Sequence, residues 1–351
     1  MGKSLIIGGG FSALVLQILN PESALVTPLT PSFLLNNRLF SRRKSVELNK
    51  MIATQAQSIG VSRFSKGFGL HDRLVLGGNS TVWGGFINIA MLPSWVIKKM
   101  ESTGIRFVDL NAGVSSYVAP EKYKQMQTCD NKILNASKLI RVDFDAYLHN
   151  IRKVGSDLEL NFFCPDQKNG WKLSSLRCSN DKKIYVAIGV VQLIDLMISS
   201  GILKEHDEIK LDEYQMNWHA HHYSKNDKFP TTSSILYKPS AIISHFLGLQ
   251  KDLKKISLFD LVGMGLRQEF SLNKRSATYK RIDGVVKPTN SHRDFGSSIH
   301  YFNMRVNGKP VSKIFSDISP NLILVGMASS IQKEPGPISN NIIQSAILAS
   351  D

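Results

Sequence analysis

Short apolar runs at the start of the chain predict a strand, a turn and a helix in close succession. Leu5 to Ile7 is an apolar run typical of a buried strand, and the glycine triplet Gly8 to Gly10 follows it directly. Leu14 to Leu19 has the apolar character of a buried helix, and Ser23 to Thr27 reads as a second strand. This order of strand, glycine turn, helix and strand predicts a βαβ unit, and therefore a parallel sheet.

The same alternation returns in the second half of the chain. Lys183 to Gly189 has the pattern of a buried strand that ends in glycine, and Val190 to Met197 reads as the helix after it. A last helix is expected over Ile342 to Ser350. We therefore predict an α/β fold built on a parallel sheet.

Other segments favour antiparallel strands. Leu158 to Phe163 alternates between apolar and polar residues, and Trp171 to Leu173 reads as the beginning of a further strand. Ser257 to Arg267 and Val285 to Val286 are expected to contribute strands to a separate substrate-binding sheet.

The first glycine turn fits the dinucleotide-binding fingerprint, with Gly8, Gly10 and Ala13 in its three positions. The first glycine permits the tight turn, the second lets the backbone approach a pyrophosphate, and the small third residue allows close packing of helix and strand. The backbone N–H groups at the helix start would then face the phosphates. A plain turn is the alternative. The residues expected to contact the cofactor here are Gly8, Gly10, Phe11, Ser12 and Ala13.

The end of the second predicted strand lacks the acid that usually binds the adenosine ribose, because Thr27 and Pro28 stand there. Three arginines follow, and they would suit a phosphorylated ribose and hence an NADP-binding protein. We favour the interpretation that they form a solvated basic face. These are Arg38, Arg42 and Arg43.

A second glycine-rich stretch runs from Arg73 to Phe86 and contains four glycines, small hydroxyl residues and one tryptophan. Such a backbone can lie against a flat ligand or a pyrophosphate without obstruction by side chains. Two glycine turns around a buried tryptophan are the alternative. The residues expected to bind the cofactor are Gly77, Gly78, Asn79, Ser80, Trp83, Gly84 and Gly85.

Together these stretches resemble the glucose–methanol–choline family of FAD-dependent oxidoreductases. The resemblance includes the Ala-x-Gly end of the strand over Lys183 to Gly189, a histidine segment near the C-terminus, and the start of the last helix. It implies catalytic roles for His300 and Asn340, and further cofactor contacts at Ala187, Gly189, Gly326, Met327 and Asn341. Because Val82 stands where some members attach the flavin through a histidine, it also implies that FAD is bound non-covalently.

The expected architecture is an FAD/NAD(P)-binding Rossmann-like domain with an inserted, smaller substrate domain that contains an antiparallel sheet. We assign the cofactor domain to residues 1–30, 70–90, 150–212 and 312–351. We assign the substrate domain to residues 31–69, 91–149 and 213–311.

The composition is that of an ordinary globular protein, with 351 residues, of which 42% are hydrophobic and 20% charged. Three cysteines without metal-binding spacing, and no credible secretory signal, favour a cytoplasmic protein with reduced thiols. The histidines at 219, 221 and 222 have no carboxylate or cysteine close by, so no metal site is expected. The net charge of +15 would allow weak association with a membrane surface or another anionic partner, but no nucleic-acid motif accompanies it.

We therefore expect an FAD-dependent enzyme that oxidises a CH–OH group of a sugar, a glycan precursor or another alcohol. Two alternatives remain open. One is an NADP-dependent dehydrogenase, and the other is an inactive flavoprotein that serves as a binding subunit.

Overall fold

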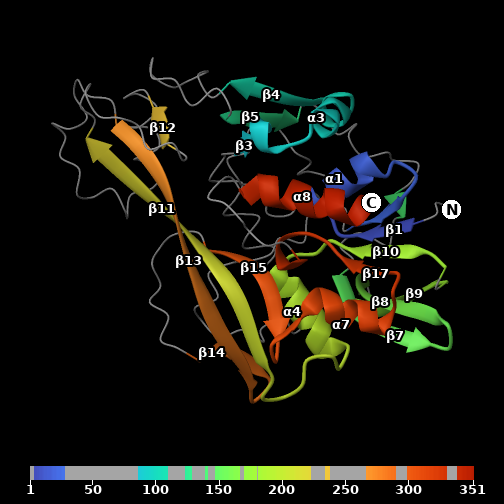
Figure 1. Ribbon diagram of the computed structural model, residues 1–351. Helices are drawn as coiled ribbons and strands as arrows, with labels where there is room; N and C mark the ends of the chain where they lie inside the picture. Colours follow the sequence, from blue (N-terminus) through green and yellow to red (C-terminus); the bar gives the residue numbers. More distant parts are fainter. Residues whose placement is uncertain are drawn as a thin grey trace.

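The structure is a computed structural model of the whole chain (Figure 1). It describes eleven segments: residues 4–27, 86–109, 123–128, 139–140, 147–166, 170–179, 181–222, 234–237, 266–289, 299–329 and 338–351. In parts of some strands, including residues 213–222 and 266–275, only the backbone is described.

A five-stranded parallel sheet forms the centre of the protein. Every neighbouring pair in it is parallel, and β1 pairs with β10 on one side and with β2 on the other. In spatial order the strands are β17 (Leu322–Leu324), β10 (Lys183–Val186), β1 (Ser4–Ile7), β2 (Ala24–Val26) and β6 (Leu139–Ile140). The sheet is built from both ends of the chain and from its middle, as the apolar runs predicted.

Both faces of this sheet are buried, because successive residues of β1, β2, β10 and β17 enter different clusters of apolar side chains. Ile6 and Tyr185 pack on the face that is covered by α1 (Phe11–Leu19) and α8 (Ile338–Ser350). Ile7 and Val186 pack on the opposite face. This burial on both sides explains why the strands are almost continuously apolar in sequence.

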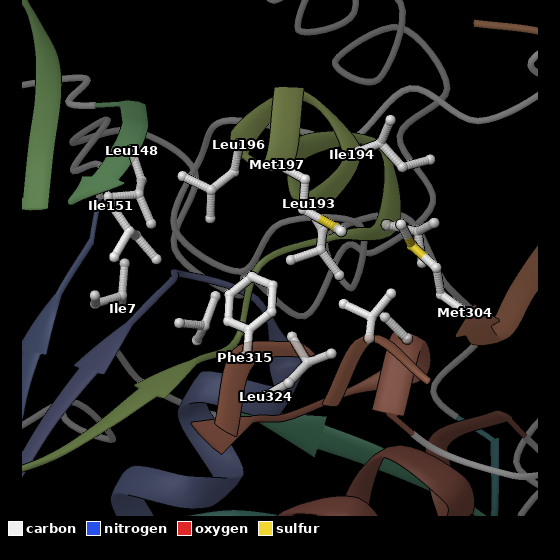
Figure 2. Close-up of a cluster of buried hydrophobic side chains, with 14 of the residues drawn as sticks. Ile7, Leu148, Ile151, Leu193, Ile194, Leu196, Met197, Met304, Phe315 and Leu324 are labelled. Atoms are coloured by element: carbon white, nitrogen blue, oxygen red, sulfur yellow. The ribbon is translucent and has the colours of Figure 1, made fainter. Parts of the chain in front are cut away.

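The second face is covered by helices and by a three-stranded antiparallel sheet. Helix α4 (Val190–Ser199) contributes Leu193 and Met197, and α7 (Val311–Ile318) contributes the fully buried Phe315 (Figure 2). The antiparallel sheet consists of β7 (Tyr147–Val154), β8 (Asp157–Asp166) and β9 (Gly170–Cys178). It contributes Leu148, Ile151 and Leu160 to the same cluster.

A smaller layer lies over α1 and α8. It contains an antiparallel sheet of β3 (Phe86–Asn88), β5 (Tyr123–Thr128) and β4 (Ile105–Asp109), in that order, together with the short helix η2 (Ile89–Met91) and α3 (Ser94–Glu101). Ile87, Val96 and Met100 are buried against the apolar residues of α1 and α8. A hydrogen bond from Lys99 Nζ to the carbonyl of Leu19 (2.7 Å) fixes α3 at the end of α1.

A long antiparallel sheet extends from the body of the protein (Figure 1). Its strands are β12 (Ser234–Tyr237), β13 (Leu266–Ile282), β11 (Glu208–His222), β15 (Ile299–Val306) and β16 (Lys309–Pro310) in spatial order, and β14 (Val285–Pro288) pairs with β13. Ile209, Leu211, Ala277 and Tyr279 anchor its near end in the core.

The predicted fold class is confirmed: a parallel sheet between two covered faces is combined with a separate antiparallel sheet. Two details differ from the sequence expectations. The C-terminal helix begins at Ile338, four residues earlier than expected, and the edge strand β6 comes from a region that we had assigned to the substrate domain. A two-residue strand is too short to give a periodic pattern in the sequence.

Of the strand expected over Ser257 to Arg267, the structure describes only Leu266 and Arg267, and both belong to β13; the rest lies outside the described part of the chain. Among the described helices, none is both long and apolar enough to cross a membrane.

Candidate functional site

The order of the parallel strands defines a topological switch point between β1 and β10. From β1 the chain passes through α1 on one face of the sheet to β2, whereas α4 follows β10 on the opposite face. In open α/β sheets, ligands bind outside the carboxyl ends of the two strands at which the connections diverge. Here the segments beyond these ends are Gly8 to Gly10 and Ala187 to Gly189.

Gly8 and Ala187 lie in direct contact at this point. Gly8 has a φ angle of +138°, and a Cβ atom at this position would lie 2.3 Å from the carbonyl oxygen of Ala187. The backbone N–H of Gly8 donates to the carbonyl of Val26 (2.9 Å), and that of Ala187 donates to the carbonyl of Ile7 (2.8 Å). The first glycine of the fingerprint is therefore required by the packing of the protein itself.

Gly10 differs from Gly8 because none of the described residues occupies the space next to it. Its φ of −83° and ψ of −177° are open to any residue, and a Cβ atom built here would meet no described atom within 4 Å. Within the described part of the chain, glycine at this position therefore leaves room beside the backbone.

Gly10 and Gly189 are the N-cap residues of α1 and α4, which begin at adjacent strand ends. Both N-cap residues are glycines, so neither has a side chain that could cap the first turn of its helix. The partial positive charge of both helix starts therefore points toward the same edge of the sheet, which is the arrangement that binds phosphate groups.

The turn after β17 reaches the same edge. Gly326 has a φ of +102°, and a Cβ atom on it would lie 2.8 Å from Oγ of Ser12 in the first turn of α1. The N–H of Gly326 donates to Oγ of Ser345 on α8 (3.0 Å), and Met327 begins the short helix η5 (Met327–Ser329). The structure thus brings the predicted residues of α1 together with those after β17.

Asn340 occupies a different environment from the one that a catalytic role requires. Its side chain is 1% exposed, and both of its polar atoms bind the backbone of Asn88. The N–H of Asn88 donates to Oδ1 (2.9 Å), and Nδ2 donates to the carbonyl oxygen of Asn88 (2.8 Å). Asn341, the next residue, is also buried. In this structure Asn340 connects α8 to β3, and the predicted contact with a substrate hydroxyl would require these bonds to be exchanged.

Two described side chains near the switch point, those of Thr27 and Tyr185, carry no charge. Thr27, at the end of β2, is 2% exposed and carries no charge, so the usual acidic contact to a ribose is missing. Burial raises the pKa of Tyr185 on β10, so this phenol remains neutral.

Several predicted site residues lie outside the described part of the chain. They are Gly77, Gly78, Asn79, Ser80, Val82, Trp83, Gly84 and Gly85 in the second glycine-rich stretch, and Arg38, Arg42 and Arg43. His300 lies on β15 opposite Tyr214 of β11, but only its backbone is described. Its role as a base remains a prediction.

Two residues at this edge were missed by sequence reasoning. Asn88 gave a weak signal, since it is the first strongly polar residue after the glycine-rich stretch. Ser345 gave none, because a serine within an apolar helix has no distinctive pattern.

Comparison with known proteins gives only distant likenesses. The sequence matches no family model and no curated protein. The solved structures that it matches include a flavoprotein/dehydrogenase from Cytophaga hutchinsonii, at 10% identity and a TM-score of 0.32, covering 99% of this chain and 76% of the other. They also include p-nitrophenol 4-monooxygenase from Pseudomonas putida, at 9% identity and a TM-score of 0.30, covering 100% and 78%. Likenesses at these scores carry no argument about function.

Proposed function

We propose that this protein is an FAD-dependent oxidoreductase that binds the cofactor's pyrophosphate at the switch point between β1 and β10. One observation carries the proposal: among the described residues, Gly10 leaves open space beside two helix starts whose N-cap residues are both glycines. Backbone donors at a helix start, with room for close approach, are what a pyrophosphate needs.

The residues present fit a dinucleotide in part. Gly10 and Gly189 would hold the phosphates, and Ser12 would lie beside them at the start of α1. The ribose would be bound without the usual carboxylate, because Thr27 is buried and uncharged. When bound, FAD supplies the hydride acceptor.

The proposal that a CH–OH group is oxidised rests on the resemblance of the C-terminal segments to glucose–methanol–choline oxidoreductases. In this reading His300 takes the hydroxyl proton, since a neutral imidazole accepts a proton efficiently near pH 7. The substrate would be an alcohol or a sugar, and the cofactor would be held without a covalent bond.

The test is an absorption spectrum of the purified protein, followed by acid or heat denaturation and filtration. Flavin bands in the spectrum, with the yellow colour in the filtrate, are the expected results. A colourless protein that binds NADPH would favour the NADP-dependent alternative. Colour retained on the precipitate would contradict non-covalent binding.

Anaerobic titration of the yellow protein with sugars and other alcohols then tests the reaction. Bleaching of the flavin by one class of alcohol is expected. Failure of the whole panel, with flavin still bound and reducible by dithionite, would favour the inactive binding subunit instead.

A further inference from the structure

The outer edge of β3 is hydrogen-bonded by one amide side chain, that of Asn340. β3 is the edge strand in the order β3-β5-β4, so one side of its backbone has no neighbouring strand within this sheet. On an edge strand, the N–H and C=O of one residue point outward together. At Asn88 these two groups meet the complementary oxygen and nitrogen of Asn340, at 2.9 and 2.8 Å.

Asparagine is suited to this contact because its amide presents one acceptor and one donor side by side. Aspartate at position 340 could accept from the N–H of Asn88 but could not donate to its carbonyl. Asn88 and Asn340 are 8% and 1% exposed, so a lost bond would leave a buried polar group without a partner.

A second polar contact joins α8 to the turn after β17. Oγ of Ser345 accepts from the N–H of Gly326 (3.0 Å) and lies 2.9 Å from Oγ of Ser329, which donates to the carbonyl of Gly326 (2.9 Å). Asn340 and Ser345 are five residues apart, which corresponds to roughly 7.5 Å along the helix and about 140° around it. Helix α8 therefore binds two separate segments on different sides.

We propose that Asn340 is a positioning residue for the cofactor site. Through Asn340 and Ser345, helix α8 would hold together two segments of the protein that form walls of this site, and we call this arrangement the clamp. In this proposal the first wall is Phe86 to Asn88, the described segment that follows the predicted cofactor-binding stretch. The other is the turn at Gly326, which lies against Ser12. The inference rests on the proposed function in that the ligand positioned is FAD, whereas the clamp itself exists without any ligand.

The experiment compares three variants with the wild-type protein. Asn340→Leu keeps the number and branching of the side-chain heavy atoms but removes both hydrogen bonds, and Asn340→Ala serves if the leucine variant does not fold. The matched control is Ile343→Val, which trims a fully buried residue of the same helix without touching either polar contact. Two quantities are measured: amide hydrogen exchange in a peptide covering residues 86–91 of the flavin-free protein, and the dissociation constant of added FAD well below the melting temperature of every variant.

In the Asn340 variants we expect exchange of the Asn88 amide to rise about tenfold or more, and FAD binding to weaken by about tenfold, the scale of one lost buried hydrogen bond. In Ile343→Val both quantities should remain within about twofold of wild type, because a buried isoleucine-to-valine change alters packing and not the polar contacts. Unchanged exchange in the Asn340 variants would overturn the clamp. Unchanged FAD binding with faster exchange, or equal weakening in Ile343→Val, would overturn the positioning role.

Failure of the proposed function gives a different result. In that case the wild-type protein binds no FAD at all, while exchange in residues 86–91 still reports whether the clamp exists.

Discussion

Gly8 and Gly10 belong to the same turn, but the structure predicts opposite effects when a side chain is added to each. At Gly8 the added atom collides with Ala187, and at Gly10 it enters space that the described residues leave open. Gly8→Ala should therefore destabilise the fold, whereas Gly10→Val should leave the fold intact and abolish FAD binding. Comparing the two variants therefore distinguishes the role of Gly8 in packing from the role of Gly10 in cofactor binding.

The magnitudes follow from the backbone at each position. At Gly8, a φ of +138° is strained for alanine, and the contact of 2.3 Å with Ala187 O forces the backbones of β1 and β10 apart. Backbone strain costs about 1–3 kcal/mol, and overpacking adds about 1–3 kcal/mol. At Gly10 the extended backbone accepts valine, and the loss of a favourable N-cap residue is offset by a less flexible unfolded chain, so the net change should be within about 1 kcal/mol.

The assay is urea unfolding of each variant in its flavin-free form, together with the flavin content after purification. The exposed residue Ser312, in the first turn of α7, provides the control Ser312→Val, which should match wild type in both. If Gly10→Val folds and retains stoichiometric flavin, the glycine turn does not hold the pyrophosphate. If Gly8→Ala is as stable as wild type, the close approach of Gly8 to Ala187 is refuted.

Three further predictions address catalysis, acid stability and the core. His300→Ala should slow flavin reduction by roughly 10²–10⁴-fold with flavin still bound, as measured by anaerobic stopped flow; an unchanged rate would exclude this base. The hydrogen bond from Arg152 lowers the pKa of Glu159, so its stabilisation is present above the ordinary glutamate pKa and is lost as the pH falls through the lower folded-state value. Melting temperatures of wild type and Glu159→Gln should therefore converge in acid, and a difference independent of pH would contradict this. Phe315→Ala should cost about 3–5 kcal/mol in urea unfolding, because the ring is fully buried; a cost below about 1 kcal/mol would mean that the ring is not packed as described.

The parallel sheet could be predicted because burial on both faces leaves a strong signal in the sequence. Leu5 to Ile7 and Ile184 to Val186 are uninterrupted apolar runs, each followed by glycine within three residues, and both became central strands. The edge strand β6 could not be predicted, since two residues paired on one side carry no periodicity. The central strands β1 and β10 therefore gave a clear hydrophobic pattern in the sequence, and the short edge strand β6 gave none.

The site was predictable where its geometry depends on the backbone. Gly8 and Gly326 have positive φ angles at which a side chain would collide with a neighbour, and the structure brings them to the same edge of the sheet as Gly10. Asn340 was different, because its partner is 252 residues away in sequence and no local pattern specifies that contact. Residues that act through long-range hydrogen bonds have to be found in three dimensions.

The difference between contacts made by the backbone and contacts made by single side chains also applies to the end of β2, where Thr27 stands in place of an acidic residue. Phosphate binding at the switch point uses helix starts and a glycine, and these tolerate almost any change in the surrounding side chains. Ribose recognition and proton transfer depend on individual side chains, which can be lost or moved without disturbing the sheet. A chain that has the glycine turn but lacks the ribose carboxylate is therefore physically consistent with a dinucleotide site.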